Sequence, residues 1–257
     1  MIHRNVLIRR ADEDGIGAGA VERDYVLAHV LAAVSRADER GRIVFKGGTA
    51  LRLCHLEEYR YSADLDFSLI DGLDRAGARE LVIDALAECA EAVEFPLLQL
   101  IDASPLRIEY VGPLGAKPRS LKVDLADDEL VEETATKPII ERYPDQVPSE
   151  CLVYTLDEIA AEKLRCVIQR LQCRDLYDLH ELLVAQGVDA EAIWPRFERK
   201  ARHRNVDPDL FATRFDARAN QWERRWDNEL AEYVPHGVAH FQALLRAVRR
   251  ELRFERG

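Results

Sequence analysis

The stretch FKGGTALRLCHLEEYRYSADLDFSL, residues 45–69, combines a turn of small residues with two closely spaced carboxylates. The small residues GGT at 47–49 follow a short apolar run, and a helical pattern comes after them. Residues 63–70 alternate strictly between apolar and polar side chains, which predicts a β-strand with one buried face. Because side chains two positions apart on a strand share a face, Asp64 and Asp66 are expected to lie side by side.

This arrangement suits the binding of a metal ion and a phosphate. Two neighbouring carboxylates repel one another, and a cation between them relieves that repulsion. Mg²⁺ prefers oxygen ligands and is usually held by one or two carboxylates together with substrate phosphates. The glycines offer backbone N–H groups at a helix start, which can cradle a phosphate, and Thr49 adds a hydroxyl donor. Asp124, on the polar face of a later strand, could supply a third carboxylate if the two strands are neighbours.

The remaining pattern predicts an α+β chain with a mixed sheet in its first half and helices in its second. Residues 127–154 contain three prolines and are expected to form a connecting loop with short elements. Thr155 and Glu158 have the spacing of a capping box at a helix start. The expected domains are therefore 1–150 and 151–257. The expected strands are 42–45, 63–70, 96–101, 106–111 and 120–126, and the expected helices are 21–38, 50–56, 74–93, 156–171, 173–187, 190–203, 207–230 and 236–253.

Composition indicates a globular chain of 257 residues, with 47% hydrophobic and 32% charged residues. No apolar run is long enough to span a membrane, and the N-terminus lacks the apolar segment of a signal peptide. Five cysteines without a CxxC pair favour free thiols in a reducing compartment, so we expect a cytoplasmic protein. The net charge is −11, but the segment from Arg196 onward holds 14 basic and 10 acidic residues. A basic tail on an acidic body can hold a polyanion locally.

The order strand, GGT, helix, DxD strand and later strand with one aspartate resembles the DNA polymerase β-like nucleotidyltransferase fold. The helical half adds to this, because residues 156–183 resemble the downstream motifs of AbiEii/AbiGii-type (MenT-like) nucleotidyltransferase toxins. The resemblance covers about 45–185. One departure is the spacing of 14 residues between Thr49 and Asp64, slightly more than the family suggests, which we interpret as one residue of loop. The motifs that carry it are KGGTALRL, RYSADLDFSL, LKVDLA, EIAAEKLRCVIQR and RDLYDL.

The resemblance implies roles for residues in both halves, with the helical domain completing the active site. The glycine turn would contact the phosphates of a nucleoside triphosphate (NTP), and Lys163 would reach them from the helical half. A lysine at such a mid-helix position is otherwise usually a surface residue. Asp178 is the expected essential acid of the helical half, with Asp175 as the alternative, and Arg174 could pair with a carboxylate or with phosphate. The expected nucleotide-binding residues are therefore Gly47, Gly48, Thr49, Lys163, Arg174 and Asp175. The expected metal ligands are Asp64, Asp66 and Asp124, and the expected catalytic residues are Asp64, Asp66, Asp124, Lys163 and Asp178.

The resemblance further implies Mg²⁺-dependent transfer of a nucleoside monophosphate (NMP) to the 3′ end of tRNA, arrest of translation, and a cognate antitoxin. One acidic residue, of which Asp124 is a candidate, would accept the proton of the attacking hydroxyl. The Arg-rich segments 196–205 and 244–256 suit contacts with RNA phosphates, and the aromatic residues near them could stack on a terminal base. These aromatic residues are Phe197, Phe211, Trp222 and Trp226.

Two other functions stay open from the sequence. The acceptor could be a small hydroxylated molecule such as an aminoglycoside, for which the acidic body could form a pocket. The chain could instead be a catalytically silent module that binds a nucleotide or a partner protein. The intact GGT, DxD and lysine motifs favour an enzyme over that last interpretation.

Overall fold

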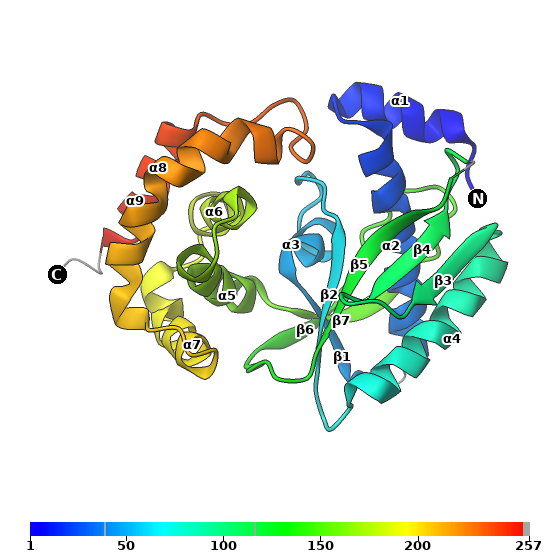
Figure 1. Ribbon diagram of the computed structural model, residues 1–257, viewed down its shortest axis with the longest axis horizontal. Helices are drawn as coiled ribbons and strands as arrows, with labels where there is room; N and C mark the ends of the chain where they lie inside the picture. Colours follow the sequence, from blue (N-terminus) through cyan, green and yellow to red (C-terminus); the bar gives the residue numbers. More distant parts are fainter. Residues whose placement is uncertain (39, 116, 254–257) are drawn as a thin grey trace. The chain divides into compact units, whose positions relative to one another are not determined.

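The computed structural model describes residues 1–38, 40–115 and 117–253, and the chain divides into two compact units (Figure 1). The first unit consists of Met1–Glu129, Thr134–Tyr154 and Tyr233–His236. The second consists of Leu130–Glu133, Thr155–Glu232 and Gly237–Gly257. Each unit therefore includes a short segment from the part of the chain that mainly forms the other.

The first unit is built around a mixed seven-stranded sheet in the order β3-β4-β5-β2-β1-β7-β6. Strand pairs β2–β5 and β1–β7 are parallel, and the other four neighbouring pairs are antiparallel. The α+β class predicted from the sequence is confirmed. The strands are β1 Ile43–Lys46, β2 Asp64–Leu69, β3 Leu97–Ile101, β4 Arg107–Val111, β5 Arg119–Ala126, β6 Thr134–Pro138 and β7 Glu150–Tyr154.

Helices α2 and α4 pack side by side against this sheet and bury the apolar faces of its strands (Figure 1). The alternation in β2 places Leu65 and Phe67 in the core, and Phe67 packs its ring against Phe45 of β1. Asp74 caps α4 by accepting a hydrogen bond of 2.8 Å from the backbone N–H of Gly77. The helical elements of this unit are α1 Arg4–Asp14, α2 Ala18–Ala37, α3 Gly47–Ala50, the π-helical turn η1 Leu51–His55, and α4 Arg75–Val93.

The second unit is helical, as predicted, and among the described residues its core is mainly aromatic and aliphatic. Thr155 accepts a hydrogen bond from the backbone N–H of Glu158, as the capping box predicts. The reciprocal hydrogen bond of a capping box is not formed by Glu158. Its carboxylate instead accepts a hydrogen bond from the backbone N–H of Glu132 and forms an ion pair of 2.6 Å with Lys200. The elements are α5 Leu156–Gln169, α6 Cys173–His180, the π-helical turn η2 Glu181–Ala185, α7 Ala190–His203, the 3₁₀ turn η3 Pro208–Leu210, α8 Phe211–Leu230 and α9 Phe241–Glu251.

The structure differs from the sequence prediction at both ends of the first unit and at the last helix of the second. Helix α1 is an additional element, and the predicted loop 127–154 contributes the strands β6 and β7 to the sheet. The helix predicted for 236–253 begins only at Phe241. Within the described residues, no helix is both long and apolar enough to cross a membrane.

Candidate active site

The glycine turn lies directly after β1 and against the carboxylate of β2. Gly47 has a φ of +79°, a backbone conformation that residues with a side chain rarely adopt. A Cβ atom at this position would lie 2.9 Å from Oδ2 of Asp66. Glycine is therefore required both by the turn and by the close approach of the aspartate.

Thr49 ties this turn to the start of β2. The buried hydroxyl of Thr49 donates to the backbone carbonyl of Asp64 at 2.6 Å and lies 2.7 Å from the hydroxyl of Ser62. The predicted phosphate-binding turn and the predicted metal-binding strand are thus joined by a direct hydrogen bond.

The three aspartates singled out from the sequence lie on two neighbouring strands. The parallel pairing of β2 with β5 places Asp66 opposite Asp124, and Asp64 opposite Lys122. A role for Asp124 required its strand to lie beside the DxD strand, and this condition is confirmed. On the other side of β2, the antiparallel pairing with β1 places Lys46 opposite Asp66.

Lys46 is a further candidate site residue, which the sequence analysis did not single out. Its side chain is only about 4% exposed, and its Nζ lies 3.2 Å from a carboxylate oxygen of Glu129. A buried ammonium is costly unless it is paired, and Glu129 supplies that partner while Asp66 lies opposite on β2. The available signal was a lysine that ends an apolar strand immediately before two glycines.

The surroundings of Asp66 make its negative charge unfavourable. Burial is the largest cause that raises the pKa of Asp66, and the charges of Asp64 and Asp124 raise it further. Lys46 and Lys122 oppose this shift without cancelling it. A divalent cation bound at this carboxylate would therefore be favoured electrostatically.

The donor set fits a hard cation held by two protein carboxylates. Across residues 1–38, 40–115 and 117–253, no group of three or more His, Cys, Asp or Glu side chains is gathered closely enough to hold an ion. Asp124 is thus not assembled with Asp64 and Asp66 into a three-carboxylate set. Mg²⁺ commonly takes only one or two carboxylates and completes its shell with water and phosphate oxygens, so the pair is sufficient.

The second unit contains a separate charged cluster, which brings together three of the predicted residues. Nζ of Lys163 lies 2.9 Å from Asp175 and 2.6 Å from Asp178. Asp175 also accepts two hydrogen bonds from Arg170, at 2.8 and 3.0 Å. Lys163 is about 5% exposed and both aspartates are fully buried, so this lysine is not a surface residue.

The charges in this cluster stabilise one another. Burial alone would raise the pKa of Asp175, but Lys163 and Arg170 outweigh burial and lower it to about 2. Burial alone would lower the pKa of Lys163, but Asp175 and Asp178 outweigh it and raise that pKa. Asp175 and Lys163 are therefore both ionised at neutral pH. The alternatives Asp175 and Asp178 turn out to be partners of the same lysine.

Nε of Arg174 donates to the side-chain carbonyl of Gln172 at 2.8 Å. The aromatic residues have different surroundings from those expected. The four aromatic residues proposed to stack on RNA, namely Phe197, Phe211, Trp222 and Trp226, are all buried to 1% exposure or less. They pack ring against ring in the helical core, so the stacking part of the RNA prediction is wrong. Residues 254–256 of the basic segment lie outside the described residues.

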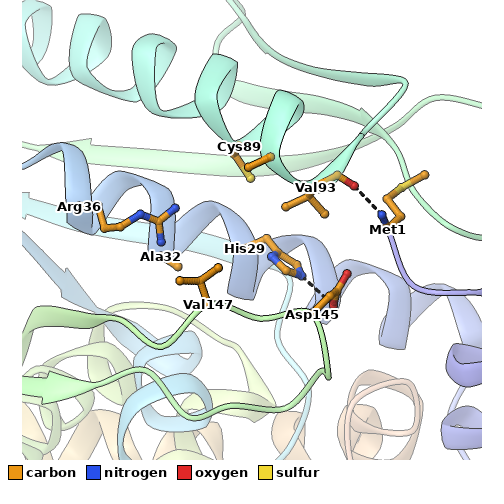
Figure 2. A pocket seen from close by; sticks show the side chains of 9 residues that line it. Met1, His29, Ala32, Arg36, Cys89, Val93, Asp145 and Val147 are labelled. Atoms are coloured by element: carbon orange, nitrogen blue, oxygen red, sulfur yellow. Dashed lines mark hydrogen bonds and ion pairs between the residues drawn. The ribbon is translucent and has the colours of Figure 1, made fainter.

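A cavity of about 120 Å³ lies elsewhere in the first unit, between α2, α4 and the loop before β7 (Figure 2). His29 lines it, with its Nε2 at 3.3 Å from Asp145. None of the predicted site residues lines this cavity, so it is not the site of the expected chemistry.

Comparisons with known proteins agree with the fold and the motifs. The structure is similar to MenT4, a nucleotidyltransferase toxin from Mycobacterium tuberculosis H37Rv, with a TM-score of 0.67 and 19% identity over 99% of this chain and 90% of that one. It is also similar to JHP933 from Helicobacter pylori, with a TM-score of 0.56 and 16% identity over 93% of each chain. Identities this low show a shared fold. No curated protein sequence matches the chain significantly.

The family is shown by the sequence itself. Residues 29–247 match the family described as nucleotidyl transferase AbiEii toxin, type IV TA system. This match spans most of the chain, including the glycine turn, the aspartates of β2 and β5, and the Lys163 cluster. The chain therefore belongs to the AbiEii nucleotidyltransferase toxins of type IV toxin–antitoxin systems.

Proposed function

We propose that this toxin uses Mg²⁺ to transfer an NMP from an NTP to the 3′ end of tRNA, and thereby arrests translation. The observation that carries the proposal is the row formed across three strands by Lys46, Asp66 and Asp124, next to the turn at Gly47. Such a row brings carboxylates, a cation and a close backbone approach together on three neighbouring central strands of the sheet.

Asp64 and Asp66 are the residues that would hold Mg²⁺. Bound there, the ion would neutralise charge on the triphosphate and on the reacting oxygens. The turn at Gly47, Gly48 and Thr49 would hold phosphate oxygens through its backbone N–H groups, since glycine permits their close approach. Catalysis by these residues would consist of positioning and electrostatic stabilisation.

Asp124 has the role of proton acceptor in this proposal. It is exposed, it lies opposite Asp66, and it is not part of a three-carboxylate set. The acceptor 3′ oxygen forms a bond to the α-phosphorus and gives its proton to Asp124. The bond from that phosphorus to the oxygen bridging to the β-phosphate breaks, and pyrophosphate leaves with the electron pair.

The Lys163 cluster is assigned to the triphosphate. Lys163 would offset negative charge on the β- and γ-phosphates, and Asp175 and Asp178 would keep it protonated and oriented. Arg174 would add a second cation. This assignment is tested by Lys163→Met, which should raise the KM for NTP and lower kcat.

The tRNA acceptor is supported by the charge distribution of the chain. The segment from Arg196 onward holds 14 basic and 10 acidic residues, whereas the rest of the chain is acidic. As a member of a toxin–antitoxin family, the toxin is also expected to have a cognate antitoxin.

The test is to incubate the purified protein with total tRNA, Mg²⁺ and each α-labelled NTP separately, beside an Asp66→Ala variant. We expect label to move to tRNA with at least one NTP, and to be lost in the variant or when EDTA is added. Label that persists in Asp66→Ala would contradict the assigned site. Transfer to an aminoglycoside but not to tRNA would favour the small-molecule acceptor. An absence of transfer by a well-folded protein would favour the silent module.

A further inference from the structure

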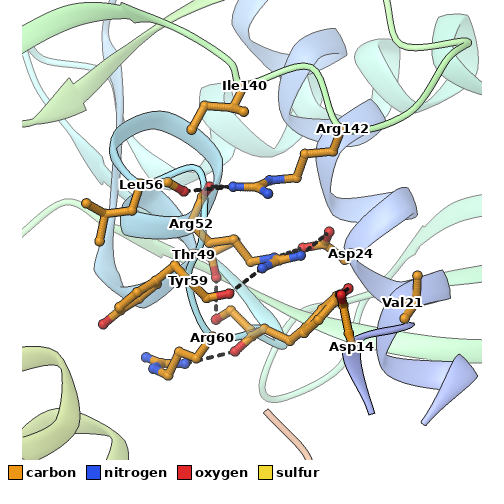
Figure 3. Close-up of polar contacts among 12 residues, drawn as sticks. Asp14, Val21, Asp24, Thr49, Arg52, Leu56, Tyr59, Arg60, Ile140 and Arg142 are labelled. Carbon is orange, nitrogen blue, oxygen red and sulfur yellow. Dashed lines mark hydrogen bonds and ion pairs between the residues drawn. The ribbon is translucent and has the colours of Figure 1, made fainter. Parts of the chain in front are cut away.

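The loop that leads into the DxD strand is irregular but largely buried. Residues 56–63 have no regular secondary structure, yet Leu56 and the run Tyr59–Ser62 are buried. The backbone polar groups of a buried loop must find partners within the protein, since water cannot serve them. Two arginines, Arg52 and Arg142, provide partners for several of these groups (Figure 3).

Arg52, on η1, joins the loop to helix α2. Its guanidinium donates to Asp24 at 2.5 and 3.0 Å and to the backbone carbonyl of Tyr59 at 2.5 Å. It also lies over the ring of Tyr61 at 3.7 Å from the centroid. Tyr143 donates to the same Asp24 carboxylate at 2.8 Å, so this carboxylate is fixed from two sides.

Arg142 holds the other end of the same loop. Its guanidinium donates to the backbone carbonyls of Arg52, Leu56 and Glu57, at 2.5, 2.8 and 2.8 Å. These carbonyls lie at the end of η1 and just after it, where helical carbonyls lack partners in their own helix. A cation is favoured at this end of a helix, so the charge of Arg142 matches its place.

The C-terminal end of the loop leads directly to Asp64, the first carboxylate of the candidate site. The backbone N–H of Tyr61 donates to the backbone carbonyl of Tyr233 at 2.7 Å, and this hydrogen bond fixes the chain just before β2. Asp64 begins β2, and its carbonyl accepts from Thr49. Asp66 lies deeper in the sheet and is held by both neighbouring strands. A loosened loop would therefore displace Asp64 before it displaced Asp66.

We propose that Arg52 and Arg142 are positioning residues for nucleotidyl transfer, because they fix the loop 56–63 and thereby the place of Asp64 beside Asp66. Neither arginine needs to touch the substrate in this role. The inference rests on the proposed metal site at the two aspartates.

The experiment measures Mn²⁺ affinity by electron paramagnetic resonance, together with kcat and KM for NTP and the thermal midpoint Tm. The test variants are Arg52→Lys, which keeps a cation but loses the planar fork, Arg142→Lys and Arg142→Met. The control is Arg36→Met, which removes an exposed guanidinium from α2 of the same unit. Arg142 is only half-buried, so its variants remain informative if Arg52→Lys fails to fold.

We expect Mn²⁺ affinity to weaken about tenfold or more in the test variants that fold, as for residues that orient metal ligands, with kcat falling in parallel. Arg142→Lys should retain more of the affinity than Arg142→Met, and Arg36→Met should match the wild type. Mn²⁺ affinity and kcat within twofold of wild type, per folded molecule, would overturn the proposal even if Tm fell.

The failure of the proposed function has a different signature. If the wild type and Asp66→Asn bound Mn²⁺ equally, or neither bound it, the metal site itself would be wrong and the positioning role would fall with it. If only Asp66→Asn lost binding while the arginine variants kept it, the metal site would stand and the positioning role alone would fail.

Discussion

Asp66 lies where its negative charge works against folding in the absence of a cation. The folded protein raises the pKa of this carboxyl, so the native state holds the proton more tightly than the unfolded chain does. Stability is therefore lost as the pH rises through the raised pKa and the group ionises. A site residue that is unfavourable for the fold by itself is common where ligand binding supplies the compensation.

The substitution Asp66→Asn is thus expected to stabilise the metal-free protein while abolishing transfer. In EDTA at pH 8, we expect a Tm about 2 °C or more above that of the wild type. This difference should shrink towards zero as the pH falls to about 4, near the ordinary pKa of aspartate. Mg²⁺ should raise the Tm of the wild type but not that of the variant. Scanning calorimetry across this pH range is the measurement, with the exposed Asp84→Asn on α4 as the control. A lower Tm for Asp66→Asn at pH 8 would contradict the electrostatic argument.

Helices α5 and α6 are joined by ion pairs as well as by apolar packing. Lys163 of α5 contacts Asp175 and Asp178, which lie one turn apart on α6. Because all three side chains are buried, removing one partner leaves an uncompensated charge, which typically costs about 3–5 kcal/mol. The packing of α6 on α5 is therefore expected to depend on pH.

The pKa of Asp175, about 2, determines the pH range of this effect. It lies below the value of about 3.9 for an unfolded aspartate. The contribution of Asp175 to stability is hence fully present above about pH 4 and is lost as the pH falls towards 2. We expect Asp175→Asn to lower Tm strongly at pH 6 and to differ much less from the wild type near pH 2.5. Thermal unfolding monitored by circular dichroism would check this, with the exposed Asp209→Asn as the control. A constant difference from pH 6 to pH 2.5 would show that Asp175 acts through its shape and not through its charge.

Strands β2 and β5 were predictable because their residues alternate and each has one buried face. The strands β6 and β7 were not, since TATKP is a polar edge strand that ends in proline, and ECLVY is short. Helix α1 was missed because it buries only Leu7 and Ala11, too few residues to give a clear helical period.

The site was predictable to a similar degree. Local motifs identified the turn and the aspartates, since their chemistry depends on residues that are close in sequence. The sequence could not show that Lys163 is buried, because its partners lie on the next helix. Nor could it show Arg52 and Arg142 meeting around one loop, because 89 residues separate them.

The charge of the whole molecule is divided along the chain. The net charge is −11, although the segment from Arg196 onward is basic. With the aromatic side chains buried in the helical core, contacts with tRNA would depend on arginines and phosphates. Such contacts release counterions, so the affinity for RNA should fall steeply with salt concentration.

The exposed arginines Arg224 on α8 and Arg246 on α9 provide a test of this dependence. Each phosphate contact contributes about 0.7–0.9 to the slope of log Kd against log salt concentration. We expect Arg224→Gln with Arg246→Gln to weaken tRNA binding and to lower this slope by about 1.5, while KM for NTP stays unchanged. The control is Arg9→Gln on α1, which removes another exposed charge from the acidic part of the chain. Filter binding of tRNA at about 50–300 mM salt gives the slope for each variant. An unchanged slope in the double variant would move the RNA contact away from these two helices, and an equal loss in Arg9→Gln would show that only net charge matters.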